Sequence, residues 1–304
     1  MSHLEVRPLV AGEESLFESM PDPLPQMRKI PYADGLGTGG YRPERTWVAI
    51  LDGRVVGRAA WVLPPGAMGR PWLERFDLSA EPEVGARLLA AAHEALGGPM
   101  FYYAAVPAHW RDDPGTVAAM ASPLDAARLA GLVESGERLR YSWRGGEVPA
   151  REGPRRPRGI RPAADVGEIT ARIAEPDVLT GRETALAVAG VDLATDPLSW
   201  LTGPPGDWLV DEDGDGLAGI AVDACYPLLA FLAAKKNRPA MLAEVCRVAS
   251  AAGAREVIAD VDAHRHDVIA DLEDGGFELL RGRLILEPSR RRPARRMRQA
   301  GQEG

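Results

Sequence analysis

The feature that most constrains this chain is an internal repeat: its two halves predict the same elements in the same order. Each half opens with a short strand, at 5–9 and at 159–163, and each then has a β-hairpin. The first hairpin turns at Asp52-Gly53, a dipeptide that favours a two-residue turn. An apolar strand, an amphipathic helix, a strand, a helix and a final strand follow in each half. The order β, α, β, β, β, α, β, α, β therefore occurs twice, which predicts a mixed α/β fold made of two tandem copies.

The repeat also predicts which segments correspond. The second hairpin is expected at 208–222, with its turn across 211–215. The apolar strand and the helix after it are expected at 73–78 and 83–96 in the first half, and at 228–232 and 239–252 in the second. The last strand, helix and strand are expected at 100–106, 124–134 and 138–143 in the first half, and at 256–261, 268–274 and 277–286 in the second.

A stretch rich in glycine, proline and arginine separates the two copies. Residues 145–161 read GGEVPAREGPRRPRGIR and have no apolar periodicity, which is typical of an interdomain linker. We therefore predict an N-terminal domain over 1–147, a linker over 148–157 and a C-terminal domain over 158–288. Residues 289–304 hold six arginines and almost no apolar side chains, which predicts a disordered basic tail.

The composition limits the kinds of partner. The 304 residues carry a net charge of -8, which disfavours nucleic acid as the main partner because phosphate binding needs a basic face. No segment approaches the roughly 18 uninterrupted apolar residues of a membrane span. The only two cysteines, Cys225 and Cys246, have no paired spacing and are expected to be buried, reduced thiols. We expect a cytoplasmic protein with no membrane partner and no metal site.

Several phrases of the sequence resemble one known superfamily. TWVAILDGRVVGRAAWV in the first half, and MLAEVCRVASAAGAREVIADVDAH with LEDGGFELL in the second, are similar to the GNAT superfamily of CoA-dependent N-acetyltransferases. The resemblance covers most of 3–143 and 158–287. It implies two tandem GNAT-like domains, each a splayed mixed sheet flanked by helices. It also implies acetyl-CoA, or another acyl-CoA, as co-substrate and a small amine as acceptor.

In GNAT proteins the pyrophosphate of acyl-CoA binds backbone N–H groups in a loop patterned [Q/R]-x-x-G-x-[G/A], at the start of the helix after the fourth strand. The first half keeps a glycine there but places Glu81 and Glu83 beside it, which would repel an anion. The second half has cations in place of the glycines, so side chains would bind the phosphates there. The candidate cofactor-binding residues are Gly85, Ala86 and Arg87, and Lys235, Lys236, Asn237, Arg238 and Ala240.

The resemblance also points to acid–base groups. In many members a tyrosine on the last helix is the general acid that protonates the departing thiolate. Here Leu132 and Leu272 stand at that position, and neither can donate a proton. Glu74 and Asp77 lie on the fourth strand, where the family often has a base; their odd spacing predicts that they point to opposite faces. His264, which follows a strand that contains Asp260, is the third catalytic candidate because a histidine beside a carboxylate can act near neutral pH.

The sequence therefore predicts a CoA-dependent N-acyltransferase, with one half catalytic and the other a degenerate copy. It does not say which half is catalytic, and it leaves a homodimer open. The alternative is a non-catalytic protein that uses two degenerate GNAT-like domains for binding or regulation, because both phosphate loops depart from the family pattern. A third interpretation, aminoacyl transfer from a charged RNA, is disfavoured by the acidic charge and supported only by the basic tail.

Overall fold

The structure, a computed structural model, describes residues 3–27, 29–63, 70–145, 159–173, 208–212, 216–221, 228–233 and 237–289, with backbone alone at 173, 220–221 and 228–233. Within these residues the predicted element order and the mixed α/β class are confirmed in both halves. The predicted linker, the turn at 213–215 and tail residues 290–304 lie outside the described part. No helix in that part is long and apolar enough to cross a membrane.

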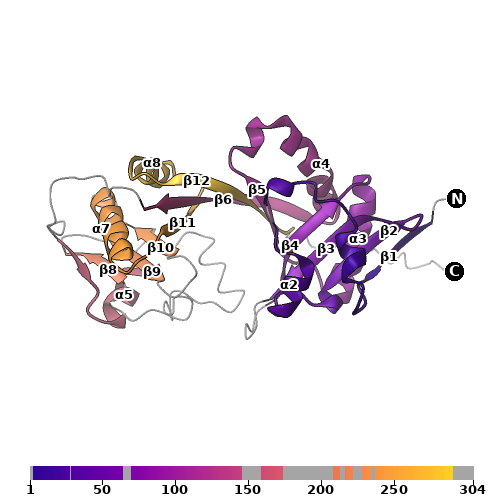
Figure 1. The fold of residues 1–304 in the computed structure, drawn as a ribbon, viewed down its shortest axis with the longest axis horizontal. Coiled ribbons are helices and arrows are strands. Elements are labelled where there is room, and N and C mark those ends of the chain that lie inside the picture. Colours follow the sequence, from indigo (N-terminus) through magenta and orange to yellow (C-terminus); the bar gives the residue numbers. More distant parts are fainter. Residues whose placement is uncertain are drawn as a thin grey trace, which may run out of the picture.

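The described strands form one mixed sheet in the order β1-β2-β3-β4-β5-β12-β6-β11-β10-β9-β8-β7 (Figure 1). Reading the order from either end gives corresponding strands of the two halves, so the sheet has a pseudo-twofold axis between β12 and β6. The first half supplies β1 (Leu4–Pro8), β2 (Thr46–Leu51), β3 (Arg54–Val62), β4 (Trp72–Leu78), β5 (Tyr102–Pro107) and β6 (Leu132–Arg144). The second supplies β7 (Ile160–Pro162), β8 (Trp208–Asp211), β9 (Leu217–Ala221), β10 (Leu228–Ala233), β11 (Glu256–Asp262) and β12 (Glu278–Pro288).

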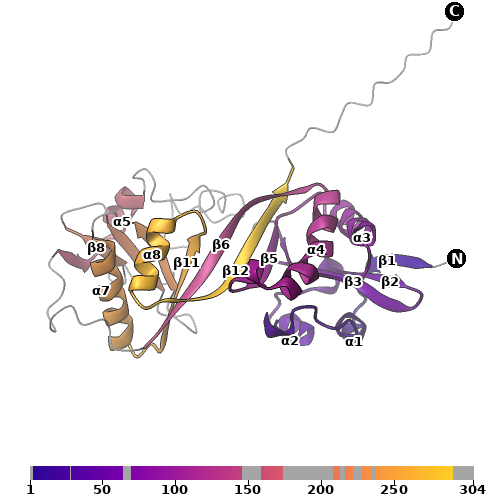
Figure 2. The ribbon, with the colours of Figure 1, turned by 90° about the horizontal axis from the view of Figure 1, so that it is seen from above.

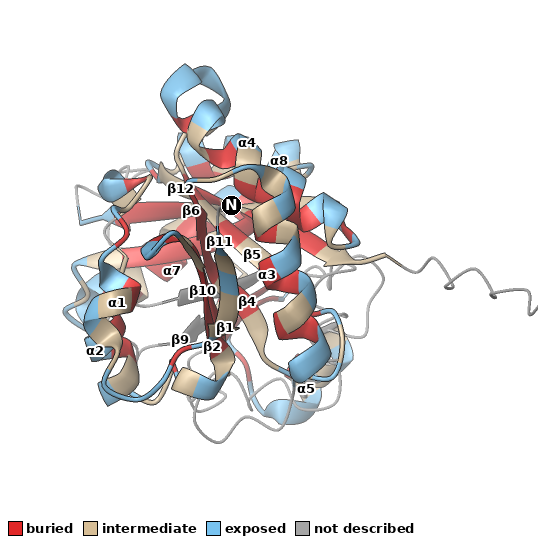
Figure 3. Ribbon diagram, turned by 90° about the vertical axis from the view of Figure 1, so that its right-hand side faces the viewer, coloured by how far each residue is buried: buried red, intermediate tan, exposed pale blue. Residues whose placement is uncertain are grey.

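Helices cover both faces of this sheet. Figure 3 shows α1 and α2 on one side of the strands and α3 on the other. The helices of the first half are α1 (Glu14–Glu18), α2 (Tyr32–Gly37), α3 (Pro82–Ala95) and α4 (Pro114–Leu129), with single 3-10 turns at η1 (Pro25–Met27), η2 (Pro43–Arg45) and η3 (Trp110–Asp112). Those described in the second half are α5 (Val166–Ile173), α7 (Arg238–Ala251) and α8 (His266–Asp274).

The predicted bounds of the last helix and the last strand of the first half are wrong, since β6 also begins six residues before the expected 138. A helix was expected over 124–134, but α4 begins ten residues earlier because Asp113 caps it, accepting hydrogen bonds from the backbone N–H groups of Gly115 and Thr116. Pro123 lies inside the helix. Gly131, with φ +87°, ends the segment in the left-handed region. Leu132 is therefore the first residue of β6 and not a helical residue.

The last strand of each half lies in the other half of the sheet. β12 pairs with β5 from Leu286↔Tyr102 to Arg281↔Pro107, and β6 pairs with β11 from Asp262↔Arg138 to Glu256↔Arg144. The two exchanged strands also pair with each other along almost their whole length (Figure 2). The sequence repeat predicted these strands but not their exchange.

Each half has its own hydrophobic core, and the exchange completes both. The first core lies between the sheet and α3 and α4, and it contains Leu284 and Leu286 of β12. The second lies under α7 and α8, and it contains Tyr141 and Trp143 of β6 together with the buried Cys246. Because apolar burial is the main stabilising term, neither core is complete without the strand of the other half.

The buried His93 of α3 makes the stability of the first core depend on pH in the acidic range. Its side chain is 4% exposed, and its ring meets the Trp61 ring edge-on at 5.8 Å. Burial, and to a lesser extent the charge of Arg70, lowers the pKa of His93 to about 4. The folded protein therefore keeps this imidazole neutral at pH values where the unfolded chain already protonates it.

We predict that the free energy of unfolding of His93→Leu depends less on pH, between about 6.5 and 4, than that of the parent protein. Above about pH 6.5 the imidazole is neutral in both states. Between about pH 6.5 and 4 only the unfolded chain binds the proton. The free energy of unfolding of the parent protein therefore falls by about 1.4 kcal/mol for each unit by which the pH is lowered. Urea unfolding of the two proteins across this range measures the difference; parallel curves would show that His93 is not the cause.

Candidate functional site

The sheet opens between its parallel strands in each half. In the first half β4 and β5 pair only at Leu73↔Tyr102, although β4 continues to Leu78 and β5 to Pro107. In the second half β10 and β11 pair at Leu228↔Ile258 and Leu229↔Ala259. All other neighbouring strands are antiparallel, so the splay that the resemblance implied occurs at these two places.

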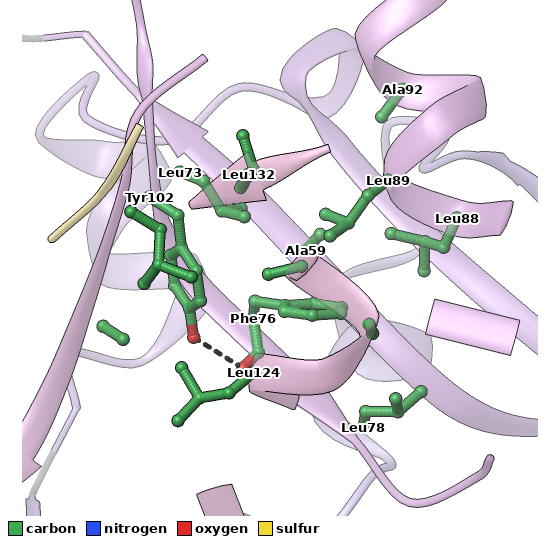
Figure 4. Close-up of a cluster of buried hydrophobic side chains, with 14 of the residues drawn as sticks. Ala59, Leu73, Phe76, Leu78, Leu88, Leu89, Ala92, Tyr102, Leu124 and Leu132 are labelled. Atoms are coloured by element: carbon green, nitrogen blue, oxygen red, sulfur yellow. Dashed lines mark hydrogen bonds between the residues drawn. The ribbon is translucent and has the colours of Figure 1, made fainter. Parts of the chain in front are cut away.

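Apolar side chains close the first opening on the face of α3 and α4. The Tyr102 hydroxyl donates to the Phe76 carbonyl at 3.5 Å, and the two rings meet edge-on at 5.9 Å (Figure 4). Leu124 of α4 lies beside them in the same cluster. Burial raises the pKa of Tyr102, so this hydroxyl stays protonated.

Gly85 serves helix packing at this point. A Cβ on Gly85 would lie 2.7 Å from Ala126 of α4 and 2.7 Å from Leu78 of β4, so only glycine lets α3 approach both. This close approach accounts for the glycine without a phosphate. Ala86 is half-buried and Arg87 exposed one turn into α3. Whether these three residues bind a phosphate stays a prediction.

A β-bulge places Glu74 and Asp77 on one face of the sheet. On β3, Ala60 lies opposite Arg75 and Trp61 opposite Leu73, so Glu74 has no partner. The extra residue changes the alternation, and the prediction that the two carboxylates point to opposite faces is wrong. Both face the α1 and α2 side, where burial and then the charges of Glu74 and Asp77 raise the pKa of Tyr41 to about 12, against the opposing effect of Arg75.

Asp77 is held by three cations. It accepts hydrogen bonds from Lys29 Nζ at 2.6 Å, Arg58 Nε at 2.8 Å and Arg75 Nε at 3.1 Å. Burial disfavours its charge, but these cations outweigh burial and keep the pKa of the carboxyl below its usual value. A buried carboxylate with this many partners is a poor base. The contacts favour a structural role over the catalytic one predicted from the sequence.

Glu74 is the more accessible carboxylate. Its side chain is 29% exposed, and one oxygen accepts from Trp72 Nε1 at 2.9 Å. The other oxygen lies 3.4 Å from Arg283 Nη2 of β12. The group is thus fixed in direction, at the edge of the opening and beside an exchanged strand.

The predicted cationic loop of the second half is only partly described. Lys235 and Lys236 lie outside the described residues. Arg238 is buried and bridges α7 to α8, contacting Asp271 through Nη1 and Asp267 through Nη2. Asn237 donates to Asp211 at 2.7 Å, and Ala240 is half-buried. Arg238 and Asn237 therefore already have protein partners where phosphate ligands were predicted.

His264 is exposed between β11 and α8. The expected pairing with a carboxylate does not occur in the described residues, because Arg140 binds both oxygens of Asp260 at 2.7 Å. Asp262 faces Arg138 at 3.8 Å. His264 thus has no orienting carboxylate there, and its catalytic role stays a prediction.

No protein-family model and no curated protein sequence matches this chain. Among solved structures it is similar to a GCN5-related N-acetyltransferase from Sphaerobacter thermophilus, with 15% identity and a TM-score of 0.58, over 94% of this chain and 96% of that one. It also aligns with a tandem GNAT protein from the clavulanic acid biosynthesis pathway (18% identity, TM-score 0.47, 93% and 98% covered). A third is a GNAT-family acetyltransferase from Colwellia psychrerythraea (12% identity, TM-score 0.45, 93% and 98% covered).

The chain has the GNAT fold. The likeness to the Sphaerobacter protein spans both halves, which agrees with the repeat in the sequence and with the splay in each half. At this identity it establishes the fold and leaves the reaction to the site residues.

The GNAT fold places a helix before its last strand, and these helices carry no tyrosine here. The sequence of α4 is PGTVAAMASPLDAARL and that of α8 is HDVIADLED. Leu272 is on α8 and buried, as expected, whereas Leu132 belongs to β6. Neither helix can thus supply a phenolic proton donor.

Sequence reasoning missed a second group beside Glu74. Arg138 and Arg140 on β6, and Arg281 and Arg283 on β12, form an Arg-x-Arg pair in the last strand of each half. Residues two apart on a strand share a face, so this repeated pair was the signal that could have revealed the group. Its proximity to Glu74 depends on the strand exchange.

The contacts of the two β4 carboxylates predict opposite effects on stability. Asp77→Asn should lower the free energy of unfolding by about 3 kcal/mol, since it leaves buried Arg58 with only the 3.8 Å contact to the half-exposed Glu18. Glu74→Gln should cost less than about 1 kcal/mol because this group is partly exposed. Urea unfolding tests both. A stable Asp77→Asn protein would return Asp77 to the catalytic candidates.

Proposed function

We propose that this protein is a CoA-dependent N-acyltransferase that transfers an acyl group, most simply acetyl from acetyl-CoA, to the amine of a small molecule in the cytoplasm. The observation that carries the proposal is the carboxylate of Glu74, fixed on the bulge of β4 where the sheet opens toward β5. A directed carboxylate beside an opening of the GNAT fold supports proton removal from an incoming amine.

We assign catalysis to the first half and a supporting role to the second. The fourth strand of the first half carries Glu74, whereas its counterpart β10 reads LLAFLA and has no titratable side chain. We take the two halves as the tandem domains predicted over 1–147 and 158–288, and the second as the degenerate copy.

In the proposed reaction the amine nitrogen attacks the thioester carbonyl carbon, a C–N bond forms and the C–S bond breaks. Glu74 takes the amine proton, while Trp72 Nε1 holds its carboxylate in direction. Because neither α4 nor α8 offers a tyrosine, water delivers the proton to the departing thiolate. Positioning of the two substrates then accounts for most of the rate increase.

The start of α3 fits the pyrophosphate of acyl-CoA in geometry but not in charge. No side chain caps the first N–H groups of this helix, which leaves donors for an anion next to Ala86 and Arg87. Glu81 and Glu83 are exposed beside them and repel an anion. The alternative site is the start of α7 with Lys235 and Lys236.

We predict that charge reversal at α3 strengthens acetyl-CoA binding. Glu83→Lys removes a repelling charge and adds an attracting one, which should raise affinity about three- to tenfold in calorimetric titration at low salt. Glu94→Lys, an exposed change near the other end of α3, is the matched control and should leave affinity unchanged.

If acetyl-CoA binds at α7 instead, the double variant Lys235→Ala with Lys236→Ala should lower its affinity, and Glu83→Lys should leave its affinity unchanged. Arg238 stays intact in both arms, because its removal would leave Asp271 and Asp267 without their buried partner.

We predict that Glu74→Gln lowers kcat about 100-fold or more and changes the KM for acetyl-CoA little, as expected for loss of a general base. Asp125→Asn, an exposed carboxylate change on α4, is the control. Equal turnover of Glu74→Gln and the parent protein would remove Glu74 from the mechanism.

The second candidate function is a non-catalytic binding or regulatory protein. Three observations favour it: Tyr102 and Phe76 fill the first opening, Gly85 is used in packing, and Arg238 is neutralised by two aspartates. Failure of every acyl-CoA to bind either half would establish this alternative.

A further inference from the structure

Four arginines line one face of the sheet at its centre. The register places Arg281 of β12 opposite Arg140 of β6, and Arg283 opposite Arg138. Leu284 of β12 points into the first core, so its neighbour Arg283 lies on the other face, with Glu74. We call these four residues the arginine row.

The strands on the two sides of the arginine row differ in the carboxylates that they place opposite its charges. On the β11 side, Asp260 lies opposite Arg140 and Asp262 opposite Arg138. On the β5 side, the residues opposite Arg283 and Arg281 are Ala105 and Pro107. β5 and β11 are related by the pseudo-twofold axis, yet β5 lacks the carboxylates that β11 supplies.

Arg281 is the group left without a partner. Its side chain is half-buried, and its guanidinium makes no hydrogen bond or ion pair within the described residues. Burial, and then the charges of Arg140 and Arg283, lower the pKa of Arg281, against the smaller opposing effects of Asp260 and Glu74. A half-buried, unpaired guanidinium is costly unless something else neutralises it.

Arg283 has only a long contact of 3.4 Å with Glu74, and its guanidinium lies 5.9 Å from the centre of the Tyr103 ring. On the β12 side of the row, Glu74 is the one carboxylate among the described residues within ion-pair distance, and it contacts Arg283 and not Arg281. The unpaired Arg281 thus lies two residues from the arginine that contacts the proposed base.

We propose that Arg281 and Arg283 bind a carboxylate of the acyl acceptor, which places the acceptor's amine at Glu74. This inference rests on the proposed function and names its substrate class, a small amino acid. A carboxylate matches the unpaired charge of Arg281, and the planar guanidinium suits it. Since Arg283 lies 3.4 Å from Glu74, the amine and the carboxylate are separated by only a few bonds.

Binding without acetyl-CoA tests this separately from catalysis. The probe is N-acetylglycine, which resembles a product, and its control is the uncharged N-acetylglycinamide. Calorimetric titration should show binding of the carboxylate about tenfold or more tighter than the amide. Arg281→Met should remove this difference and Arg281→Lys retain part of it. Arg144→Met, an exposed change on β6, should leave it unchanged.

Ala105→Asp provides an internal ligand for the row. It introduces opposite Arg283 the carboxylate that Asp260 presents to Arg140. The variant should keep or raise Tm and lose about tenfold in affinity for N-acetylglycine. A merely unfolded protein would lose both, so the two readouts separate blocking of the site from damage to the fold.

Equal binding of the acid and the amide, or no binding of either, overturns the inference even if the protein acetylates other amines. So does Arg281→Met with undiminished affinity. Tighter binding of phosphoethanolamine than of N-acetylglycine overturns the carboxylate assignment in favour of a phosphate. Carboxylate-selective binding without any acyl transfer supports the inference and contradicts only the proposed function.

Discussion

The pairing of β6 with β12 is the interaction on which the rest of this structure depends. It runs from Leu132↔Pro288 to Ser142↔Glu278 and joins the two halves into one sheet. Through it each hydrophobic core receives two large side chains from the other half, Leu284 and Leu286 in one direction and Tyr141 and Trp143 in the other. The tandem copies are therefore one cooperative unit, because separating them exposes apolar surface on both sides.

The same pairing assembles the candidate site. Glu74 comes from β4 and the arginine that contacts its carboxylate from β12, more than 200 residues later in the sequence. The bulge turns Glu74 toward the face of α1 and α2, and the exchange brings Arg283 and Arg281 to that face. A first half with β6 in the position of β12 would present Arg138 and Arg140 instead. The exchange thus determines which arginine pair lies beside the proposed base.

Local signals in the sequence predicted the local structure well. The structure places the hairpin at Asp52-Gly53 and the helices predicted at 83–96 and 239–252 within one residue of the expected positions. These elements could be predicted because turn propensity and apolar periodicity depend only on residues close together in the sequence. The bulge could not be predicted, since one unpaired residue at Glu74 has no signature in the β4 sequence. Strand exchange was equally hidden, because β6 and β12 have similar patterns and either fits beside β5.

The charged residues show why site prediction from the sequence was less accurate. The charge and position of Arg238 and Asp77 predicted functional roles, yet the structure gives each of them oppositely charged partners. A charge signals binding only when the folded chain leaves it uncompensated. By that criterion Arg281 is a stronger candidate for ligand binding than Arg238. The difference lies in which residues stand opposite: Ala105 and Pro107 on β5 in place of Asp260 and Asp262 on β11. Divergence of the two copies at these positions therefore leaves a positive charge on the side of the sheet that also carries Glu74.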